Sequence, residues 1–275
     1  MNDADFQVIR QVVRDRSGIV LEAGKAYLAE SRLGPLVREE RLGSLDALVA
    51  RLRSPDANGL RIRVAEAMAT TETYFFRDHL PFEALRSTIL PEILARRSHV
   101  RTLNVWSAAC SSGQEVYSVA MLLREHFGAL PGWRVRLVAS DLSREMLRRA
   151  QEGVYSQLEV NRGLPAPLLV RYFEKCGLDW RIRDELRRSV EFRRVNLVEP
   201  WPELPPMDLI LLRNVLIYFD DAARRAALAR ARLLLGPDGC LVLGSAETPV
   251  LLDDGYERWQ VDQTLFYRPR RSRRA

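Results

Sequence analysis

A run of small residues between two apolar segments is the first candidate for ligand-binding chemistry in this chain of 275 residues. Residues 102–106 have the β-branched and aromatic content of a strand, and apolar residues recur along 117–123 as in a buried helix. Residues 107–113 between them are only Ser, Ala, Cys and Gly, which let a ligand approach the backbone closely. The run predicts a nucleoside-binding turn. A turn that merely packs a helix on a sheet is the alternative, because neither G-x-G-x-x-G nor G-x-x-x-x-G-K-[ST] is present.

Polar residues follow two later predicted strands. Asp141 ends the apolar segment 135–140, where an open α/β sheet places the carboxylate that accepts hydrogen bonds from ribose hydroxyls. Asp141 could instead be the N-cap of a helix over 143–150. Asn196 and Leu197 suit the edge and the face of an adenine, and a plain turn explains them as well.

The strongest buried-strand pattern lies at residues 207–212, a nearly continuous apolar run that is typical of a central parallel strand. It predicts a position in the middle of the sheet. Arg213, Asn214 and, a few residues later, Tyr218 then reach the carboxyl edge, where ligands of such sheets bind.

Residues 70–78 combine polar β-branched side chains with three aromatic residues and an arginine, Arg77. This composition suits the wall of a pocket, and an arginine beside aromatic rings could orient a carboxylate through a bidentate contact. A linker with an exposed arginine is the alternative.

The formal net charge of +6 comes mostly from the C-terminus, because arginines in residues 268–275 contribute +5. The rest of the chain is nearly neutral, whereas nucleic-acid binders usually spread Lys and Arg over one face. We therefore expect no nucleic-acid partner. Residues 268–275 are predicted to be a basic, disordered tail.

Cysteine usage and hydropathy bear on the compartment. Three scattered cysteines and three histidines predict neither a disulfide framework nor a metal site. The chain has no N-terminal export pattern and no apolar run approaching ~18 residues. These features predict a cytoplasmic protein without membrane insertion.

The helical pattern of residues 1–76 predicts a small N-terminal helical domain, followed by a larger domain over 77–275. Residues 153–190 interrupt the alternation of strands and helices, and they predict an inserted β-rich unit. Residues 32–63 carry seven basic and four acidic side chains. This local excess is either a solvated helix face or a docking face for an acidic partner.

Four separated motifs, in this order, resemble those of the CheR family of chemoreceptor glutamate methyltransferases, and the resemblance covers almost the whole chain. They are Thr-Thr-Glu-Thr-Tyr-Phe-Phe-Arg at 70–77, Val-Trp-Ser-Ala-Ala-Cys-Ser-Ser-Gly-Gln-Glu at 105–115, Ala-Ser-Asp at 139–141 and Leu-Arg-Asn-Val-Leu-Ile-Tyr-Phe at 212–219. The resemblance implies an α/β fold. It combines a Rossmann-like S-adenosylmethionine-dependent methyltransferase sheet with a small all-helical N-terminal domain and an inserted antiparallel β-subdomain.

The resemblance also implies a set of cofactor contacts. The matching positions are Thr71, Thr73, Arg77, Glu115, Asp141, Asn196, Leu197, Arg213 and Asn214. It implies that Glu115 contacts the methionine end of S-adenosylmethionine, Asp141 the ribose, and Asn196 with Leu197 the adenine. Thr71 stands where the family usually has asparagine, and Val116 stands where proline usually follows the glutamate.

The implied reaction transfers a methyl group to glutamate side chains on the cytoplasmic signalling helices of chemoreceptors, with Arg77 and Tyr218 beside the methyl group. A glutamate is already ionised at neutral pH, so its oxygen needs no general base. We expect a monomer that docks receptors through residues 32–63. We also expect no need for a receptor C-terminal pentapeptide, because residues 173–180 are short and contain one glycine.

Two other functions are compatible with the same pattern. One is methylation of a nucleic acid or a small molecule, which the near-neutral body and the missing Asn/Asp-Pro-Pro-Phe/Tyr motif disfavour. The other is a signalling adaptor that binds S-adenosylmethionine without transferring its methyl group. Presence of both Arg77 and Tyr218 argues for an enzyme, and Thr71 leaves the adaptor open.

Overall fold

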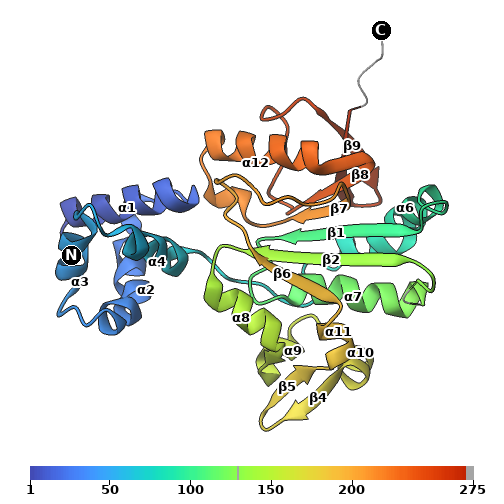
Figure 1. The fold of residues 1–275 in the computed structure, drawn as a ribbon, viewed down its shortest axis with the longest axis horizontal. Helices are drawn as coiled ribbons and strands as arrows, with labels where there is room; N and C mark the ends of the chain where they lie inside the picture. Colours follow the sequence, from blue (N-terminus) through green and yellow to red (C-terminus); the bar gives the residue numbers. More distant parts are fainter. Residues whose placement is uncertain (129, 271–275) are drawn as a thin grey trace.

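A seven-stranded sheet forms the centre of the computed structural model, which describes residues 1–128 and 130–270 (Figure 1). The first five strands across it run parallel, and the last two are antiparallel to their neighbours. In their order across the sheet, the strands are β6 (Val190–Arg194), β2 (Arg134–Asp141), β1 (Thr102–Ala108), β7 (Met207–Leu212), β8 (Leu235–Leu243), β10 (Thr264–Pro269) and β9 (Tyr256–Val261).

Strand β7 lies in the middle of this sheet and is buried along its whole length, which confirms the prediction from its apolar run. Its side chains alternate between two cores, as successive residues of a strand must. Leu209 and Leu211 join a cluster with the helices α6 (Leu90–Arg96) and α7 (Gln114–Phe127). Ile210 and Leu212 join the other, with α12 (Asp221–Leu234). The sheet is therefore covered on both faces.

Four helices form the N-terminal part and stand beside the sheet at its left in Figure 1. They are α1 (Asp3–Ser17), α2 (Ala26–Glu39), α3 (Leu45–Leu52) and α4 (Asn58–Met68), with a short 3₁₀ turn at Ala23–Lys25. Their apolar stripes meet in one cluster through residues such as Ile9, Leu33, Leu48 and Val64. The helical pattern was expected to reach residue 76, but α4 ends at Met68 and the following segment runs without helix to His79.

The pattern of residues 80–97 predicts a connecting helix, which is present with one irregularity. Helix α5 (Leu80–Ala84) leads through a π-helical stretch at Leu85–Ile89 into α6. Pro81 lies in the first turn of α5, where a missing N–H costs little, and Pro91 lies just after the π-helical stretch.

The inserted unit between α8 (Arg144–Glu152) and β6 contains more helix than its composition indicated. Its antiparallel sheet has the order β3 (Val154–Tyr155), β5 (Asp179–Ile182), β4 (Phe173–Cys176). Three short helices accompany it: α9 (Gln157–Asn161), α10 (Ala166–Tyr172) and α11 (Asp184–Arg187).

Two predictions near the C-terminus are wrong. The Gly-Pro-Asp-Gly run at 236–239 predicts a turn that closes the preceding helix before a strand at 240, but β8 begins at Leu235, directly after α12, and absorbs these residues as a register shift against β7. Arg268, expected in a disordered tail, lies in β10, where it pairs with Glu92 at 2.8 Å and covers the ring of Trp259. The remaining tail, 271–275, lies outside the described residues.

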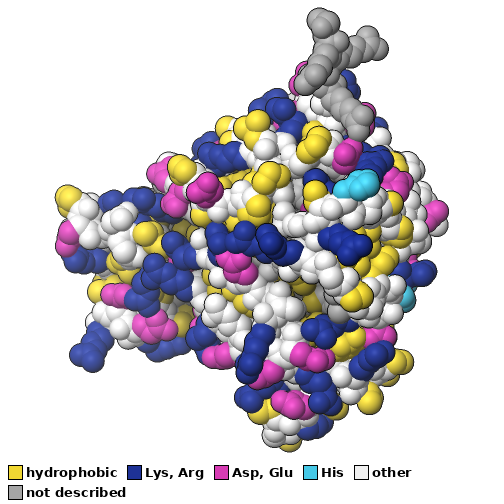
Figure 2. All heavy atoms as spheres, turned by 45° about the vertical axis from the view of Figure 1, so that its right-hand side comes forward, with side chains coloured by type: hydrophobic (Ala, Val, Ile, Leu, Met, Phe, Trp, Pro, Cys, Tyr) yellow, Lys and Arg dark blue, Asp and Glu magenta, His cyan; other side chains and the backbone are white. Residues whose placement is uncertain are grey.

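Charged side chains of both signs are interspersed over the face shown in Figure 2, with apolar side chains between them. Within residues 1–128 and 130–270, no helix has the length and apolar character needed to cross a membrane.

Candidate functional site

A cavity opens at the carboxyl ends of β1, β2, β6 and β7, and it encloses about 820 Å³ of space including its mouth. Nine of the positions that the sequence indicated line the cavity: Thr73, Arg77, Glu115, Asp141, Asn196, Leu197, Arg213, Asn214 and Tyr218. Thr71 does not line it. The exposed Thr71 lies in a separate groove between α2, α4 and the start of α8, and only its carbonyl reaches toward the cavity loop, accepting from Ser111 Oγ at 2.6 Å.

The small-residue turn after β1 has an unusual backbone. Ala109 and Ser111 have φ angles of 55° and 51°, and Gly113 has 94°. Left-handed backbone at non-glycine residues costs energy and is concentrated at functional sites. A Cβ atom on Gly113 would lie 2.9 Å from the Cβ of Ala150 on α8. Gly113 thus permits the close approach of α8, whereas Ala109, Cys110 and Ser111 face the cavity.

Asp141 is buried and holds this turn from the end of β2. Its Oδ2 accepts from the backbone N–H of Ser111, and its Oδ1 accepts from that of Ser143, each at 2.8 Å. Burial raises the pKa of the Asp141 carboxyl, and the two backbone N–H groups oppose this rise. The alternative of an N-cap role is wrong, because the N-cap of α8 is Ser143, whose side chain accepts from Met146.

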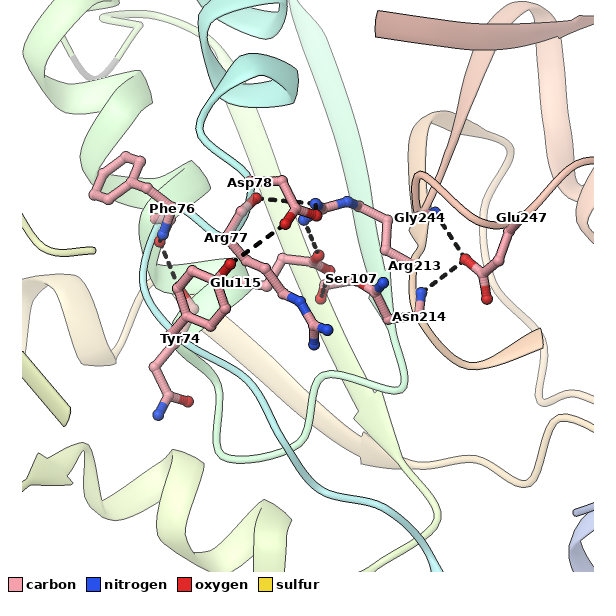
Figure 3. Close-up of polar contacts among 12 residues, drawn as sticks. Tyr74, Phe76, Arg77, Asp78, Ser107, Glu115, Arg213, Asn214, Gly244 and Glu247 are labelled. Atoms are coloured by element: carbon pink, nitrogen blue, oxygen red, sulfur yellow. Dashed lines mark hydrogen bonds and ion pairs between the residues drawn. The ribbon is translucent and has the colours of Figure 1, made fainter. Parts of the chain in front are cut away.

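A charge network centred on the buried Arg213 joins β7 to the opposite wall of the cavity (Figure 3). Arg213, with a side chain 1 % exposed, donates from Nη1 to Glu115 Oε2 at 3.0 Å and from Nη2 to Asp78 Oδ2 at 2.8 Å. Arg213 Nη2 also donates to the carbonyl of Arg77 at 2.9 Å, and Ser107 Oγ donates to Glu115 Oε1 at 2.8 Å. The network therefore binds residues 77–78 to the sheet.

Arg77 and Tyr218 contribute donors that the protein itself leaves largely unused. Arg77 Nη1 donates to the carbonyl of Glu72 at 2.8 Å, and its guanidinium lies 5.6 Å from the centre of the Tyr74 ring. Within the described residues, Arg77 Nε is buried without a hydrogen-bond partner, and the Tyr218 hydroxyl makes no hydrogen bond. Both side chains line the cavity, so together they can bind an anionic group such as a carboxylate.

Asn196 connects the cavity to the N-terminal helices. Asn196 Nδ2 donates to the carbonyl of Arg16 at 2.7 Å, near the end of α1. Ser17 and Ile19, which follow, also line the cavity. Sequence analysis did not single out these two residues, because nothing in their local pattern indicates that the end of α1 reaches the sheet.

Asp78 and Glu247 were missed as well. Asp78 directly follows the Arg77 motif, and this position could have indicated that its carboxylate belongs to the site. Its partner there is Arg213. Glu247 accepts from backbone N–H groups of the loop after β7. The one local feature that points to Glu247 is its position shortly after β8, which ends at the same edge of the sheet as the cavity.

The residues of the cavity fit a nucleoside joined to an amino acid. Asp141 provides a buried carboxylate beside the turn at one end, and Leu197 with Val195 provides an apolar wall. Glu115 and Arg213 provide a carboxylate and a guanidinium at the other end, and Arg213 Nε is buried without a partner in the described part of the chain. This cavity and the sheet order are those of an S-adenosylmethionine-dependent methyltransferase.

Comparison with known proteins specifies the family. Residues 71–263 match the family model "CheR methyltransferase, SAM binding domain", and residues 4–68 match "CheR methyltransferase, all-alpha domain". Chemotaxis protein methyltransferase 1 of Pseudomonas aeruginosa is 41% identical over 271 residues, covering 97% of this chain and 98% of the relative. Chemotaxis protein methyltransferase of Borreliella burgdorferi is 32% identical, covering 86% of each chain.

The chain therefore belongs to the CheR methyltransferase family, and its cofactor is S-adenosylmethionine. The predicted fold class and the family resemblance are confirmed. Among solved structures, magnesium protoporphyrin IX methyltransferase from Synechocystis with bound S-adenosylmethionine is similar at a TM-score of 0.38 and 15% identity, covering 77% of this chain and 91% of that chain.

Proposed function

We propose that this protein transfers the methyl group of S-adenosylmethionine to glutamate side chains on the cytoplasmic signalling helices of chemoreceptors, giving glutamate methyl esters. The observation that carries the proposal is the pair of Arg77 and Tyr218, whose available donors line the same cavity as the cofactor-side residues. The related chains named as chemotaxis methyltransferases support the same setting.

The reaction requires alignment more than proton transfer. S-Adenosylmethionine supplies an electrophilic methyl group, and the attacking glutamate oxygen is already ionised at neutral pH. Arg77 and Tyr218 donate to the carboxylate and hold one oxygen in line, because correct placement alone contributes much of the rate. Asp78, Glu115 and Arg213 keep the wall that carries Arg77 in place.

The direct test is transfer of labelled methyl from S-adenosylmethionine to purified receptor signalling domains, followed by mild alkali. We expect label on the receptor that alkali releases as methanol, since carboxyl methyl esters hydrolyse and N-methyl groups do not. Alkali-stable label would indicate another substrate class. Cofactor binding without any transfer to several receptors would favour the adaptor.

Most arginines of residues 32–63 already have partners within the protein, which leaves few of them available to bind a receptor. Arg51 pairs with Asp56, Arg53 with Asp5, and Arg63 with Glu39 and Glu40. Arg32 and Arg61 donate to backbone carbonyls. In the described ranges, the side chains of Arg38 and Arg41 have no such partner, so we assign receptor docking to them.

Charge reversal tests this assignment. Arg38→Glu is expected to raise KM for the receptor about fivefold at low salt with little change in kcat, because an exposed charge acts mainly on association. Arg258→Glu makes the same charge change on the exposed face of the edge strand β9 and should leave KM unchanged. Equal effects of both variants would show a general charge effect rather than a docking site.

We further propose that methylation does not need a receptor C-terminal pentapeptide. The turn between β4 and β5 is a tight hairpin in which Cys176 pairs with Asp179, leaving only Gly177 and Leu178 between them. Receptors with and without their C-terminal pentapeptide should be methylated with the same KM. A KM at least tenfold lower for the intact receptor would contradict this proposal.

A further inference from the structure

The loop after β7 carries much of the site on irregular backbone. Arg213, Asn214 and Tyr218 line the cavity, but only a three-residue 3₁₀ turn, Leu216–Tyr218, gives this loop regular structure. Asn214 has a φ angle of 58°, in the left-handed region that few residues other than glycine and asparagine adopt. Such a loop keeps one geometry only if its surroundings impose it.

A single carboxylate supplies much of that constraint. Glu247 Oε2 accepts from the backbone N–H groups of Asn214 and Gly244, each at 2.7 Å. Glu247 Oε1 accepts from those of Val215 at 2.9 Å and Ile217 at 3.2 Å. Figure 3 shows the Glu247 carboxylate between the Gly244 and Asn214 backbones. One buried side chain thus satisfies three backbone donors of the loop, at 214, 215 and 217, and one of its own turn.

No basic side chain of the described residues forms an ion pair with Glu247. The negative charge, in a residue only 8% exposed, is therefore compensated by backbone dipoles. Gly244 is part of the same arrangement, because a Cβ atom there would lie 2.8 Å from Glu247 Oε2 and 3.0 Å from the Asn214 nitrogen. A larger residue at 244 would push the carboxylate away from the loop.

Other contacts hold the far half of the loop independently. The Val20 N–H donates to the carbonyl of Tyr218 at 2.8 Å, and Arg224 Nε donates to the carbonyl of Leu216 at 2.9 Å. These contacts engage carbonyl groups, whereas Glu247 is the acceptor for the N–H groups nearest Arg213. Loss of Glu247 would therefore release the inner half of the loop without detaching it from the fold.

We propose that Glu247 is a positioning residue of the methyltransferase: its carboxylate sets the backbone at 214–217 and so places Arg213, Asn214 and Tyr218 in the cavity. The expected effect on turnover rests on the proposed function, whereas the expected effect on the geometry of the loop does not. Glu247 itself does not line the cofactor cavity.

Glu247→Gln is the sharpest variant, because it preserves size and leaves one acceptor oxygen. The amide NH₂ would then face backbone N–H groups, so two of the four donors lose their acceptor. We expect kcat to fall about 30-fold, since misplacement of about 1 Å can cost about 100-fold. Affinity for S-adenosylhomocysteine should fall by a smaller factor than kcat, because Arg213 and Asn214 line the cavity but Asp141 and Leu197 are held by other contacts.

The matched control is Asp208→Asn at the other end of β7. Asp208 is also a buried carboxylate, and it accepts from Arg97 Nε at 2.6 Å and from the Asn104 N–H at 2.8 Å. This variant should lose thermal stability while keeping kcat per cofactor-binding molecule. Wild-type kcat in Glu247→Gln, or an equal loss of kcat in both variants, would overturn the proposal.

Amide hydrogen exchange separates this inference from the proposed substrate. In the full-length protein without receptor, Glu247→Gln should speed exchange at residues 214–217 at least about tenfold while Asp208→Asn does not. Unchanged exchange at this loop overturns the inference, whatever the methylation assay shows. Absence of receptor methylation by the wild type concerns only the proposed function. If Glu247→Gln does not fold, Gly244→Ala serves, since it displaces the same carboxylate.

Discussion

The two ends of β7 bury charged side chains in different ways. At the amino end, Asp208 is paired with Arg97 and the Asn104 backbone, and Arg97 is 28% exposed. At the carboxyl end, Arg213 is 1% exposed and is shared between Glu115 and Asp78. Both arrangements satisfy buried charge, so burial of an ion pair does not by itself identify a functional site.

Available donors and irregular backbone distinguish the carboxyl end. Of the four buried side-chain atoms without partners in the described residues, Arg77 Nε and Arg213 Nε belong to residues that line the cavity. Ala109, Ser111 and Asn214 adopt positive φ angles around the same cavity. At the amino end of β7 the pairing with β8 shifts register between Met207 and Leu209, but no residue of this strand has a positive φ angle. Unused hydrogen-bonding capacity facing a cavity is thus the better marker of chemistry.

Arg213→Ala should have the largest effect on stability. It leaves Glu115 buried without its cation, which typically costs about 3–5 kcal/mol of unfolding free energy. Arg97→Ala at the other end should cost less, because Arg97 is partly solvated and Asp208 keeps a backbone donor. Urea denaturation measures both. Equal losses would remove the distinction between the two ends.

Arg77→Ala should lower kcat about 100-fold or more, because the carboxylate loses its cationic anchor. The variant should fold normally, since the Arg77 side chain makes one hydrogen bond to the protein. Arg86→Ala removes an exposed, paired arginine from the following helical stretch and should leave kcat within twofold. Methyl transfer at the wild-type rate in Arg77→Ala would exclude this residue from the mechanism.

Tyr218→Phe should lower kcat about tenfold with little loss of stability, because the Tyr218 hydroxyl donates to no group of the described protein. Tyr256→Phe should do the opposite. Its buried hydroxyl donates to the carbonyl of Leu228 at 2.8 Å, so its loss should cost about 1 kcal/mol without affecting turnover. Steady-state kinetics and thermal unfolding of the pair separate a site hydroxyl from a structural one.

Asp141→Asn should change the pH dependence of stability. Burial raises the pKa of Asp141 above its ordinary value of 3.8, so ionisation of this group destabilises the fold. The stability that the protonated Asp141 contributes is fully present below pH 3.8, the pKa of the unfolded chain. It is lost as the pH rises through the pKa of the folded state. Asparagine does not ionise, so the variant does not lose this stability. As the pH rises, the unfolding free energy of the variant should therefore increase relative to that of the wild type.

Denaturation at a series of pH values checks this shift, with Asp220→Asn as the control. Asp220 has a lowered pKa because the Ala223 N–H and then Arg14 bind its carboxylate, so its shift should have the opposite sign. Parallel pH profiles for Asp141→Asn and the wild type would show that burial of Asp141 has no such linkage.

Sequence patterns were sufficient for most strands of the main sheet and for most of the cavity. The turn at 107–113, the carboxylate at 141 and the polar residues after β7 follow strands whose carboxyl ends must share one edge of a parallel sheet. Their proximity was therefore predictable from strand order alone. Arg77 was identified by its unusual aromatic surroundings and by the family resemblance.

Contacts between distant segments were not predictable in this way. Thr71 belongs to the same motif as Thr73, yet only Thr73 lines the cavity, because the path of the chain after α4 decides which side chain faces inward. Residues 236–239 have turn composition, but pairing with β7 draws them into β8. Arg268 is ordered by Glu92 and Trp259, which lie elsewhere in the chain.

The sequence by itself determined most strands and helices around the main sheet and which chemistry-bearing residues end them, because these properties depend on local spacing of side chains. The tertiary structure alone decided that Ser17 and Ile19 close the cavity and that Glu247 holds the loop of Tyr218. Hydrogen bonds to backbone groups far along the chain leave no periodic pattern in the sequence, so only the folded chain reveals them.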